Sequence, residues 1–344
     1  MHEPLETAEV EDVPTITTVA RLANVSVASA SRVLNGIRTS PATLERVTAA
    51  AESVGYVPNA AARSLRSRRT GQIAFAMPDV GNPVYTAMVA SIQEVARAAG
   101  VRLLLHSTGA DSDDELAMIR DLRHRYVDGL ILACLHLTRE HAAELSVSAA
   151  PVVVIGRPTV GTRVDTVRAY SRKGAADAVR HLHAVGRTRI AFVNGPTHTA
   201  PGSSRRRGYL DGLRSCGLPR DEELIQVASD FMVEPGRSAA ELLLARVRPD
   251  AILCANDLLA VGVLAALRDA GLEVPEQVAL VGMDNCDLSA LTWPALTTVD
   301  LGSSERARIA AELLLARIEE PGRDAQVVGV APRLVVRDSS GATA

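Results

Sequence analysis

Cysteine and lysine are scarce in this chain of 344 residues, and both shortages are informative. Lys173 is the single lysine, so the basic charge is carried almost entirely by arginine; with the abundant alanine, this indicates a GC-rich genome. The cysteines lie far apart and form no C-x-x-C pair, which leaves a zinc site or a disulfide framework without support. The four are Cys134, Cys216, Cys254 and Cys286.

Long apolar runs and catalytic motifs are also absent. No apolar stretch reaches the roughly 20 residues that a membrane crossing needs. The first residues lack the basic and apolar regions of a signal peptide, so we expect a cytoplasmic protein. The sequence contains no G-x-S-x-G, H-E-x-x-H, P-loop or G-x-G-x-x-G pattern. We therefore expect neither an enzyme nor a bound cofactor or metal.

The charge is close to neutral overall, at −3, but it is unevenly distributed. Residues 1–14 carry a net charge of −5 and contain no lysine or arginine. Residues 15–70 carry +6, and the remainder is acidic. A compact basic segment on an acidic body is typical of a nucleic-acid-binding module. The acidic start is expected to be a disordered tail.

The basic segment has the pattern of a helix-turn-helix. Thr15 is placed to cap a first short helix, and residues 24–26 form a tight turn in which Asn24 tolerates a left-handed backbone. Ser26 can then cap a second helix, and Ser40 with Pro41 begins a third. A generic small helical bundle is the alternative. The apolar residues of the second helix recur every three or four positions: Val27, Ala30, Val33 and Leu34.

Two motifs carry a resemblance to a known family. The first is V-A-x-x-A-x-V-S-x-x-x-x-S-R-V-L-N, from residue 19, and the second is G-Y-x-P-N-x-x-A-R-S-L, from residue 55. Together they resemble the signature of the lactose-repressor/galactose-repressor family of bacterial transcriptional regulators, and the likeness continues over nearly the whole chain from Thr15. The resemblance implies a DNA-binding domain at 15–58, a hinge helix or linker at 59–70, and an effector-binding and dimerisation domain at 71–344.

The resemblance also implies which residues contact DNA. The second helix would lie in the major groove, with Arg32 reaching guanine or phosphate and Val27 and Ala28 offering only apolar contact. The family often has larger polar residues at those two positions, so no operator sequence can be carried over. Leu65 would wedge between base pairs in the minor groove, or else pack on a neighbouring helix. The implied DNA-contacting residues are Thr15, Val27, Ala28, Ser29, Ser31, Arg32, Asn35, Asn59, Arg63, Leu65 and Arg66.

The larger domain alternates short β-rich runs with amphipathic helices. Strands are predicted at 72–77, 101–107 and 189–194, and helices at about 83–99, 113–126, 171–184, 205–215 and 235–246. This rhythm predicts parallel sheets covered on both faces. Two successive α/β units resemble the two-lobed periplasmic-binding-protein-like fold. In that fold lobe 1 would comprise about 71–168 and 301–330, and lobe 2 about 169–300 and 331–344.

Strand-end residues are expected to line a ligand cleft between the lobes. Arg205 and Asp284 are the strongest candidates, although they could form a purely structural ion pair. Tyr85 and Phe231 offer flat faces to a sugar or base, but ordinary core packing is the alternative. Asp257 fits helix capping better, and Trp293 is expected near the cleft edge. The implied effector-binding residues are Asn82, Val84, Tyr85, Arg205, Phe231, Asn256 and Asp284.

These observations predict a dimeric regulator, most simply a repressor, that binds a palindromic operator under the control of a sugar-like or nucleoside-like effector. No heptad pattern follows the last predicted strand, which favours a dimer over a tetramer. A transport-associated binding protein would share the cleft but not the basic module. The sequence does not choose between an inducer and a corepressor.

Overall fold

The computed structural model describes residues 14–57, 69–157 and 163–341. The expected acidic tail and most of the expected hinge, including Asn59, Arg63, Leu65 and Arg66, lie outside the described residues. The chain divides into two compact units, one ending at Thr70 and the other beginning at Gly71.

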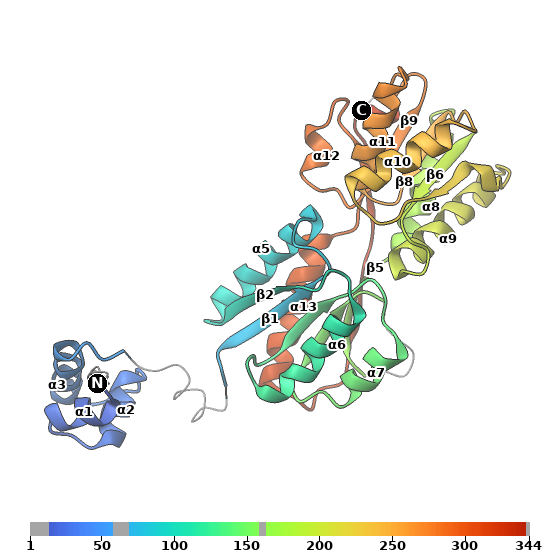
Figure 1. The fold of residues 1–344 in the computed structure, drawn as a ribbon. Helices are drawn as coiled ribbons and strands as arrows, with labels where there is room; N and C mark the ends of the chain where they lie inside the picture. Colours follow the sequence, from blue (N-terminus) through green and yellow to red (C-terminus); the bar gives the residue numbers. More distant parts are fainter. Residues whose placement is uncertain (1–13, 58–68, 158–162, 342–344) are drawn as a thin grey trace, which may run out of the picture. The chain divides into compact units, whose positions relative to one another are not determined.

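The first unit is a bundle of three helices: α1 (Ile16–Leu22), α2 (Val27–Leu34) and α3 (Pro41–Ser53) (Figure 1). Each helix begins at a hydroxyl cap, because the side chains of Thr15, Ser26 and Ser40 each accept a hydrogen bond from a backbone N–H of the first turn. Asn24 adopts the predicted left-handed backbone at φ 51°. The small core is made of Val19, Ala20, Ala23, Ala30, Val33, Val47, Ala50 and Ala51.

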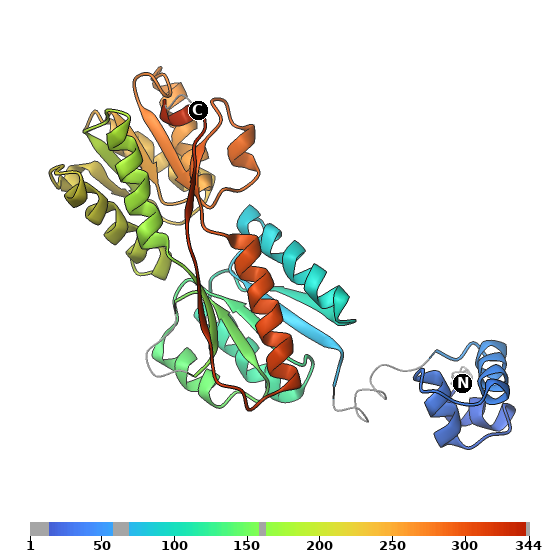
Figure 2. The ribbon, with the colours of Figure 1, turned by 180° about the vertical axis from the view of Figure 1, so that it is seen from behind.

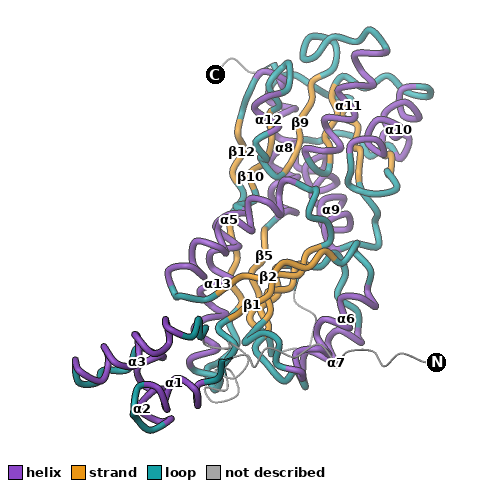
Figure 3. The backbone as a smooth tube through the Cα atoms, turned by 60° about the vertical axis from the view of Figure 1, so that its left-hand side comes forward, coloured by secondary structure: helices purple, strands orange, loops and turns teal. Residues whose placement is uncertain are grey.

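The second unit contains two six-stranded sheets, which Figure 3 shows as two separate groups of strands. We call the part around each sheet lobe 1 and lobe 2. Every recorded strand pair in lobe 1 is parallel, and in lobe 2 only the pair of β10 and β12 is antiparallel. In lobe 1 the order is β11 (Val327–Val330), β5 (Asp165–Ala169), β4 (Val152–Ile155), β3 (Leu130–Ala133), β1 (Gln72–Met77), β2 (Arg102–Ser107). In lobe 2 it is β12 (Arg333–Val335), β10 (Thr297–Asp300), β9 (Ala279–Met283), β8 (Ala251–Cys254), β6 (Ile190–Asn194), β7 (Ile225–Val227).

Helices cover both sheets. In lobe 1, alternate residues of β1 enter two different cores: Phe75 packs with α5 and α13, whereas Ala74 and Ala76 pack with α6. The lobe 1 helices are α5 (Pro83–Ala98), α6 (Ser112–Asp121), η1 (Leu122–His124), α7 (Arg139–Ser146) and α13 (Ser303–Glu319). Those of lobe 2 are α8 (Ser171–Ala184), α9 (Ala200–Ser215), η2 (Glu222–Leu224), α10 (Val233–Leu244), α11 (Asp257–Asp269), α12 (Leu288–Leu291) and η3 (Asp338–Ser340). A helical module followed by two α/β lobes confirms the predicted fold class.

The chain passes between the lobes three times, and Figure 2 shows these connections running side by side. They follow β5, β10 and β11, and lead respectively to α8, α13 and β12. Two helices differ from the sequence prediction in their limits. Helix α9 begins at Ala200 rather than 205, because Thr199 caps it and a proline occupies its first turn. Helix α6 ends at Asp121 and continues only as one 3-10 turn, since Arg125 takes a left-handed backbone at φ 54°.

Among the described residues, no helix combines the length and the apolar character needed to span a membrane.

Helices α10 and α11 approach closely at glycine. A Cβ atom built on Gly262 would overlap the carbonyl oxygen of Val233, and one on Gly236 would lie 2.6 Å from the carbonyl oxygen of Leu259. Because both obstacles are backbone atoms of a packed helix pair, neither can move aside easily.

We expect Gly262→Ala to lower the free energy of unfolding by about 1–3 kcal/mol, despite the better helix propensity of alanine. Urea unfolding of the full chain measures this change. Gly322→Ala is the matched control, because nothing lies within 4 Å of its Cβ position and its backbone is not left-handed. Equal stability of the two variants would contradict the close helix contact.

Candidate functional site

Helix α2 carries five of the seven predicted DNA-contacting residues that lie in the described part of the chain. Ala30 and Val33 are buried in the bundle core, which turns Val27, Ala28 and Arg32 outward. Val27 is 43% exposed, although it is apolar. Ser29 and Ser31 are half-buried, and Thr15 and Asn35 are exposed at helix ends. The face therefore combines one cation with apolar and small polar groups, as a major-groove surface requires.

The polar residues of α2 differ in whether they already make hydrogen bonds within the helix. Ser29 donates its backbone N–H to Ser26 Oγ at 3.1 Å, and Asn35 donates Nδ2 to the Ser31 carbonyl at 2.6 Å. For Arg32, the described part of the chain records neither an ion pair nor a side-chain hydrogen bond. Arg32 is thus the group on α2 most available to a phosphate or base.

A cleft of about 550 Å³ lies in the second unit, and all seven predicted effector-binding residues line it. Asn82, Val84 and Tyr85 begin α5 just after β1, and Phe231 follows β7. Asn256 lies two residues after β8, and Asp284 directly follows β9. The residues therefore meet because the carboxyl ends of parallel strands share one edge of each sheet.

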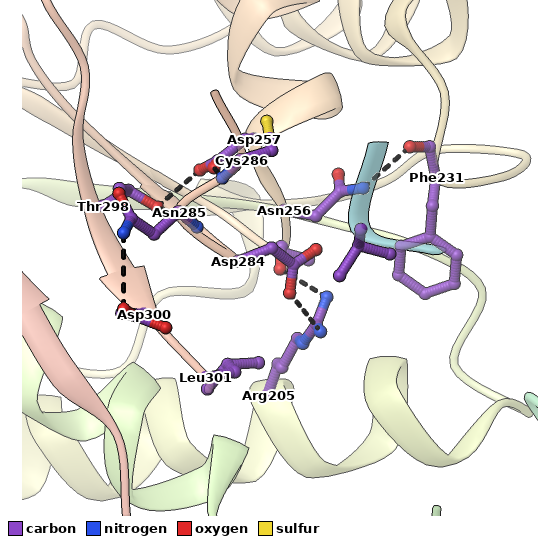
Figure 4. Close-up of polar contacts among 12 residues, drawn as sticks. Arg205, Phe231, Asn256, Asp257, Asp284, Asn285, Cys286, Thr298, Asp300 and Leu301 are labelled. Carbon is purple, nitrogen blue, oxygen red and sulfur yellow. Dashed lines mark hydrogen bonds and ion pairs between the residues drawn. The ribbon is translucent and has the colours of Figure 1, made fainter. Parts of the chain in front are cut away.

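Arg205 and Asp284 form a buried ion pair in the cleft, with Arg205 Nη2 3.2 Å from Asp284 Oδ1 (Figure 4). Arg205 also donates Nη1 to the Ala255 carbonyl at 2.6 Å and lies 5.9 Å from the centre of the Phe231 ring. Burial raises the pKa of Asp284, and the positive charges of Arg205 and Arg306 oppose that rise. Arg205 Nε is buried and has no hydrogen-bond partner in the described part of the chain, so the ion pair leaves a donor unused there.

Two predicted effector residues also cap helices, and a third, Tyr85, keeps its proton. Asn256 caps α11 through Oδ1 and donates Nδ2 to the Phe231 carbonyl at 2.9 Å, which fixes the loop that carries the phenyl ring. Asn82 caps α5 by accepting the Val84 N–H at 3.1 Å. Burial raises the pKa of Tyr85, as does the negative charge of Asp284, so its hydroxyl remains a donor. Asn82 and Asn256 therefore both line the cleft and cap a helix.

Two expectations need correction. Asp257 does open α11 as an acid in its first turn, as predicted, but the residue that caps the helix is Asn256. Asp257 is buried, and accepts hydrogen bonds from the Thr298 hydroxyl at 2.5 Å and the Cys286 N–H at 2.9 Å (Figure 4). Trp293 is 93% exposed and does not line the cleft. Trp293 lies in the turn after the short helix α12, which was not predicted from the sequence.

Sequence reasoning missed the arginines that reach the cleft from other segments. Arg157 and Arg168 come from lobe 1, Arg172 from the start of α8, and Arg306 from the first turns of α13. The strand ends could have indicated the first two. Arg157 lies two residues after the end of β4, and Arg168 is the last residue but one of β5. Arg306 follows no strand directly, so the strand-end rule does not find it.

Comparisons with known proteins agree on both units of the chain. The family model described as "Bacterial regulatory proteins, lacI family" matches residues 15–59, and a periplasmic binding protein-like domain matches residues 179–340. Catabolite control protein A of Priestia megaterium is 32% identical over 95% of this chain and 99% of its own. The ribose operon repressor of Escherichia coli gives the same figures. A solved transcriptional regulator, CelR in complex with cellobiose, is 31% identical with a TM-score of 0.73, covering 95% of this chain and 99% of that one.

The buried Asp257 predicts a pH dependence. Burial, together with the nearby charge of Asp284, raises its pKa from 3.8 to about 7. Because the folded state then holds the proton more tightly than the unfolded state, this carboxyl lowers stability as the pH rises from about 4 to about 7. We expect Asp257→Asn to remove that loss, on the order of a few kcal/mol, since the amide can still bond both Thr298 and Cys286.

Thermal unfolding of the full chain at a series of pH values between 4 and 8 measures this effect. Asp269→Asn is the control, because Asp269 lies at the other end of the same helix and is partly exposed beside Arg237 and Arg268. An equal pH slope for the wild-type protein and Asp257→Asn would show that Asp257 titrates normally.

Proposed function

Because this chain belongs to the lacI family of bacterial regulatory proteins, and is therefore a DNA-binding transcriptional regulator and not an enzyme, we propose that a small effector in its cleft controls its hold on DNA. The observation that carries the proposal is the Arg205–Asp284 pair, which sits beside Phe231 in a cleft of about 550 Å³. Paired donors and acceptors next to an aromatic face recognise hydroxyl-bearing rings. A sugar-like or nucleoside-like effector fits this chemistry.

The proposed regulator is a repressor that binds a palindromic operator as a homodimer in the cytoplasm. A single short recognition helix per chain reads only half a site, so two copies are needed for specificity. Lobe 2 exposes Leu291 at 79% and Trp293 at 93%, and such apolar groups suit a contact between two copies. Within the repressor, Arg32 supplies the main cation of α2. The roles of Asn59, Arg63, Leu65 and Arg66 in the hinge stay predictions from the resemblance.

Control follows from the way the lobes are joined. Three connections link them, and the Ala200 N–H of lobe 2 donates to the Leu135 carbonyl of lobe 1 at 2.7 Å. An effector that touches both lobes favours one relative orientation and so shifts the population of states. If that orientation separates the two hinges of the dimer, DNA is released and the effector is an inducer. We favour a sugar that acts as an inducer, because this is what the family resemblance implies.

The DNA-binding part is tested by retention of sheared genomic DNA. We expect the wild-type protein to enrich a short inverted repeat, and Arg32→Ala to lose about 1–3 kcal/mol of binding free energy for that repeat. Arg46→Ala is the matched control, because Arg46 is exposed on α3 and its Nε bonds the Ala42 carbonyl of its own helix. Failure of the wild-type protein to enrich any repeat at low salt, with or without cell metabolites, would contradict the proposal.

The effector part is tested on the enriched repeat with a panel of small metabolites. We expect Arg205→Ala to retain DNA but to lose the response that a metabolite produces in the wild-type protein, because the cleft loses its fork of donors. Arg206→Ala, next in the chain and paired with Glu222 at 3.1 Å, should respond normally. Thermal unfolding separates loss of the response from loss of the fold. A full response from folded Arg205→Ala would exclude Arg205 from the effector site.

A further inference from the structure

Arg306 is a buried cation that the surrounding protein leaves without an ionic partner. It lines the cleft from the first turns of α13 and is only 9% exposed. Its Nε donates to the Leu301 carbonyl at 3.1 Å. No ion pair is recorded for it among residues 14–57, 69–157 and 163–341, and the two terminal nitrogens of its guanidinium have no recorded hydrogen bond there. An arginine in such a place normally has a carboxylate beside it.

The carboxylates near Arg306 are already engaged. Asp284 pairs with Arg205 at 3.2 Å. Asp300 accepts the Gly302 N–H at 2.7 Å and the Asn285 amide at 3.3 Å, and lies 3.6 Å from Arg333. Burial lowers the pKa of Arg306, and the charge of Arg205 lowers it further, while Asp284, Tyr85 and Asp300 act in the opposite sense. Its place near the start of α13 adds a cost, because the positive end of the helix dipole repels a cation.

Other nitrogens around the cleft are also unused. The Nε atoms of Arg205 and Arg168 are buried, and neither has a hydrogen-bond partner among the residues that the structure describes. Arg168 lies over the ring of Tyr170, with its guanidinium carbon 5.2 Å from the ring centre. The charged residues that line the cleft are Arg157, Arg168, Arg172, Arg205 and Arg306 against Asp79, Asp230 and Asp284. The lining therefore carries a positive excess and has donors left over.

We propose that the effector carries an anionic group, a carboxylate or a phosphate, which binds between Arg306 and Arg205. The inference rests on the proposed function of the cleft and narrows its ligand to an acid or phosphate ester of a sugar or nucleoside. The planar guanidinium binds both kinds of oxyanion through paired N–H donors. The flat faces of Phe231 and Tyr85 take the uncharged part of the molecule.

Thermal unfolding of the full chain at constant ionic strength tests the inference. The probes are glucose and adenosine, their anionic counterparts gluconate, glucose 6-phosphate and adenosine 5′-monophosphate, and inorganic phosphate. We expect at least one anionic probe to raise the wild-type Tm by about 5 °C while its neutral counterpart does not. Gluconate and glucose 6-phosphate distinguish a carboxylate site from a phosphate site. No rise with any of the anions overturns the inference.

Arg306→Leu tests whether Arg306 binds the anion. The ligand-free variant loses the Nε bond to the Leu301 carbonyl, so the quantity compared is the rise in Tm that an anion produces, not the Tm of the ligand-free protein. We expect Arg306→Leu to lose the rise that the wild-type protein shows, because leucine carries no charge, and an equal rise in both proteins would overturn the inference. Arg308→Leu is the matched control, because Arg308 lies two residues on, half-exposed, and pairs with Glu312 at 2.6 Å.

Retention of the enriched DNA repeat separates this inference from the proposed function. If a neutral sugar releases DNA equally from the wild-type protein and from Arg306→Leu, the anion site is wrong and the regulator stands. If the wild-type protein retains no DNA under any condition, the proposed function fails. The Tm measurements then decide the anion site by themselves.

Discussion

The buried contact between Arg205 and Asp284 is the constraint on which the cleft depends. Asp284 follows β9 with a backbone φ of 111°, a conformation that a non-glycine residue adopts only when its surroundings hold it there. Its backbone N–H donates to the Val299 carbonyl of β10 at 2.8 Å. Its side chain binds Arg205, which also binds the Ala255 carbonyl after β8 and lies near the Phe231 ring. The Arg205 guanidinium thus connects α9 to the ends of β8 and β9 and to the loop after β7. These segments form the side of the cleft that lobe 2 contributes.

The sequence predicted the parts of the structure that depend on local rules. Hydroxyl caps, apolar periodicity and strand ends are read from neighbouring residues, so the three N-terminal helices and the parallel α/β lobes were found correctly. The residues that end strands also meet in the cleft, because parallel strands end at one edge. Their binding roles stay predictions.

The remainder depends on contacts distant in sequence. Asp257 opens a helix, and local rules assign it to the cap, but its partner Thr298 lies 41 residues away and draws it into the interior. Arg306 stands at the start of a helix that crosses back from lobe 2 to lobe 1. Nothing next to it in the sequence shows that this start faces a cleft. Without the fold it looks like one more solvated arginine on an amphipathic helix.

The position of the two arginines links charge to movement of the lobes. Arg306 belongs to lobe 1 and Arg205 to lobe 2, and the charge of Arg205 disfavours the charged form of Arg306. Asp284, the partner of Arg205, attracts Arg306 more strongly than Arg205 repels it, so the charges of lobe 2 already favour Arg306 in part. An anion held between the two arginines would add an attraction to one cation on each lobe. If the proposed effector is anionic, part of its binding free energy therefore favours the orientation in which both arginines reach it, and a neutral molecule of the same shape lacks that contribution.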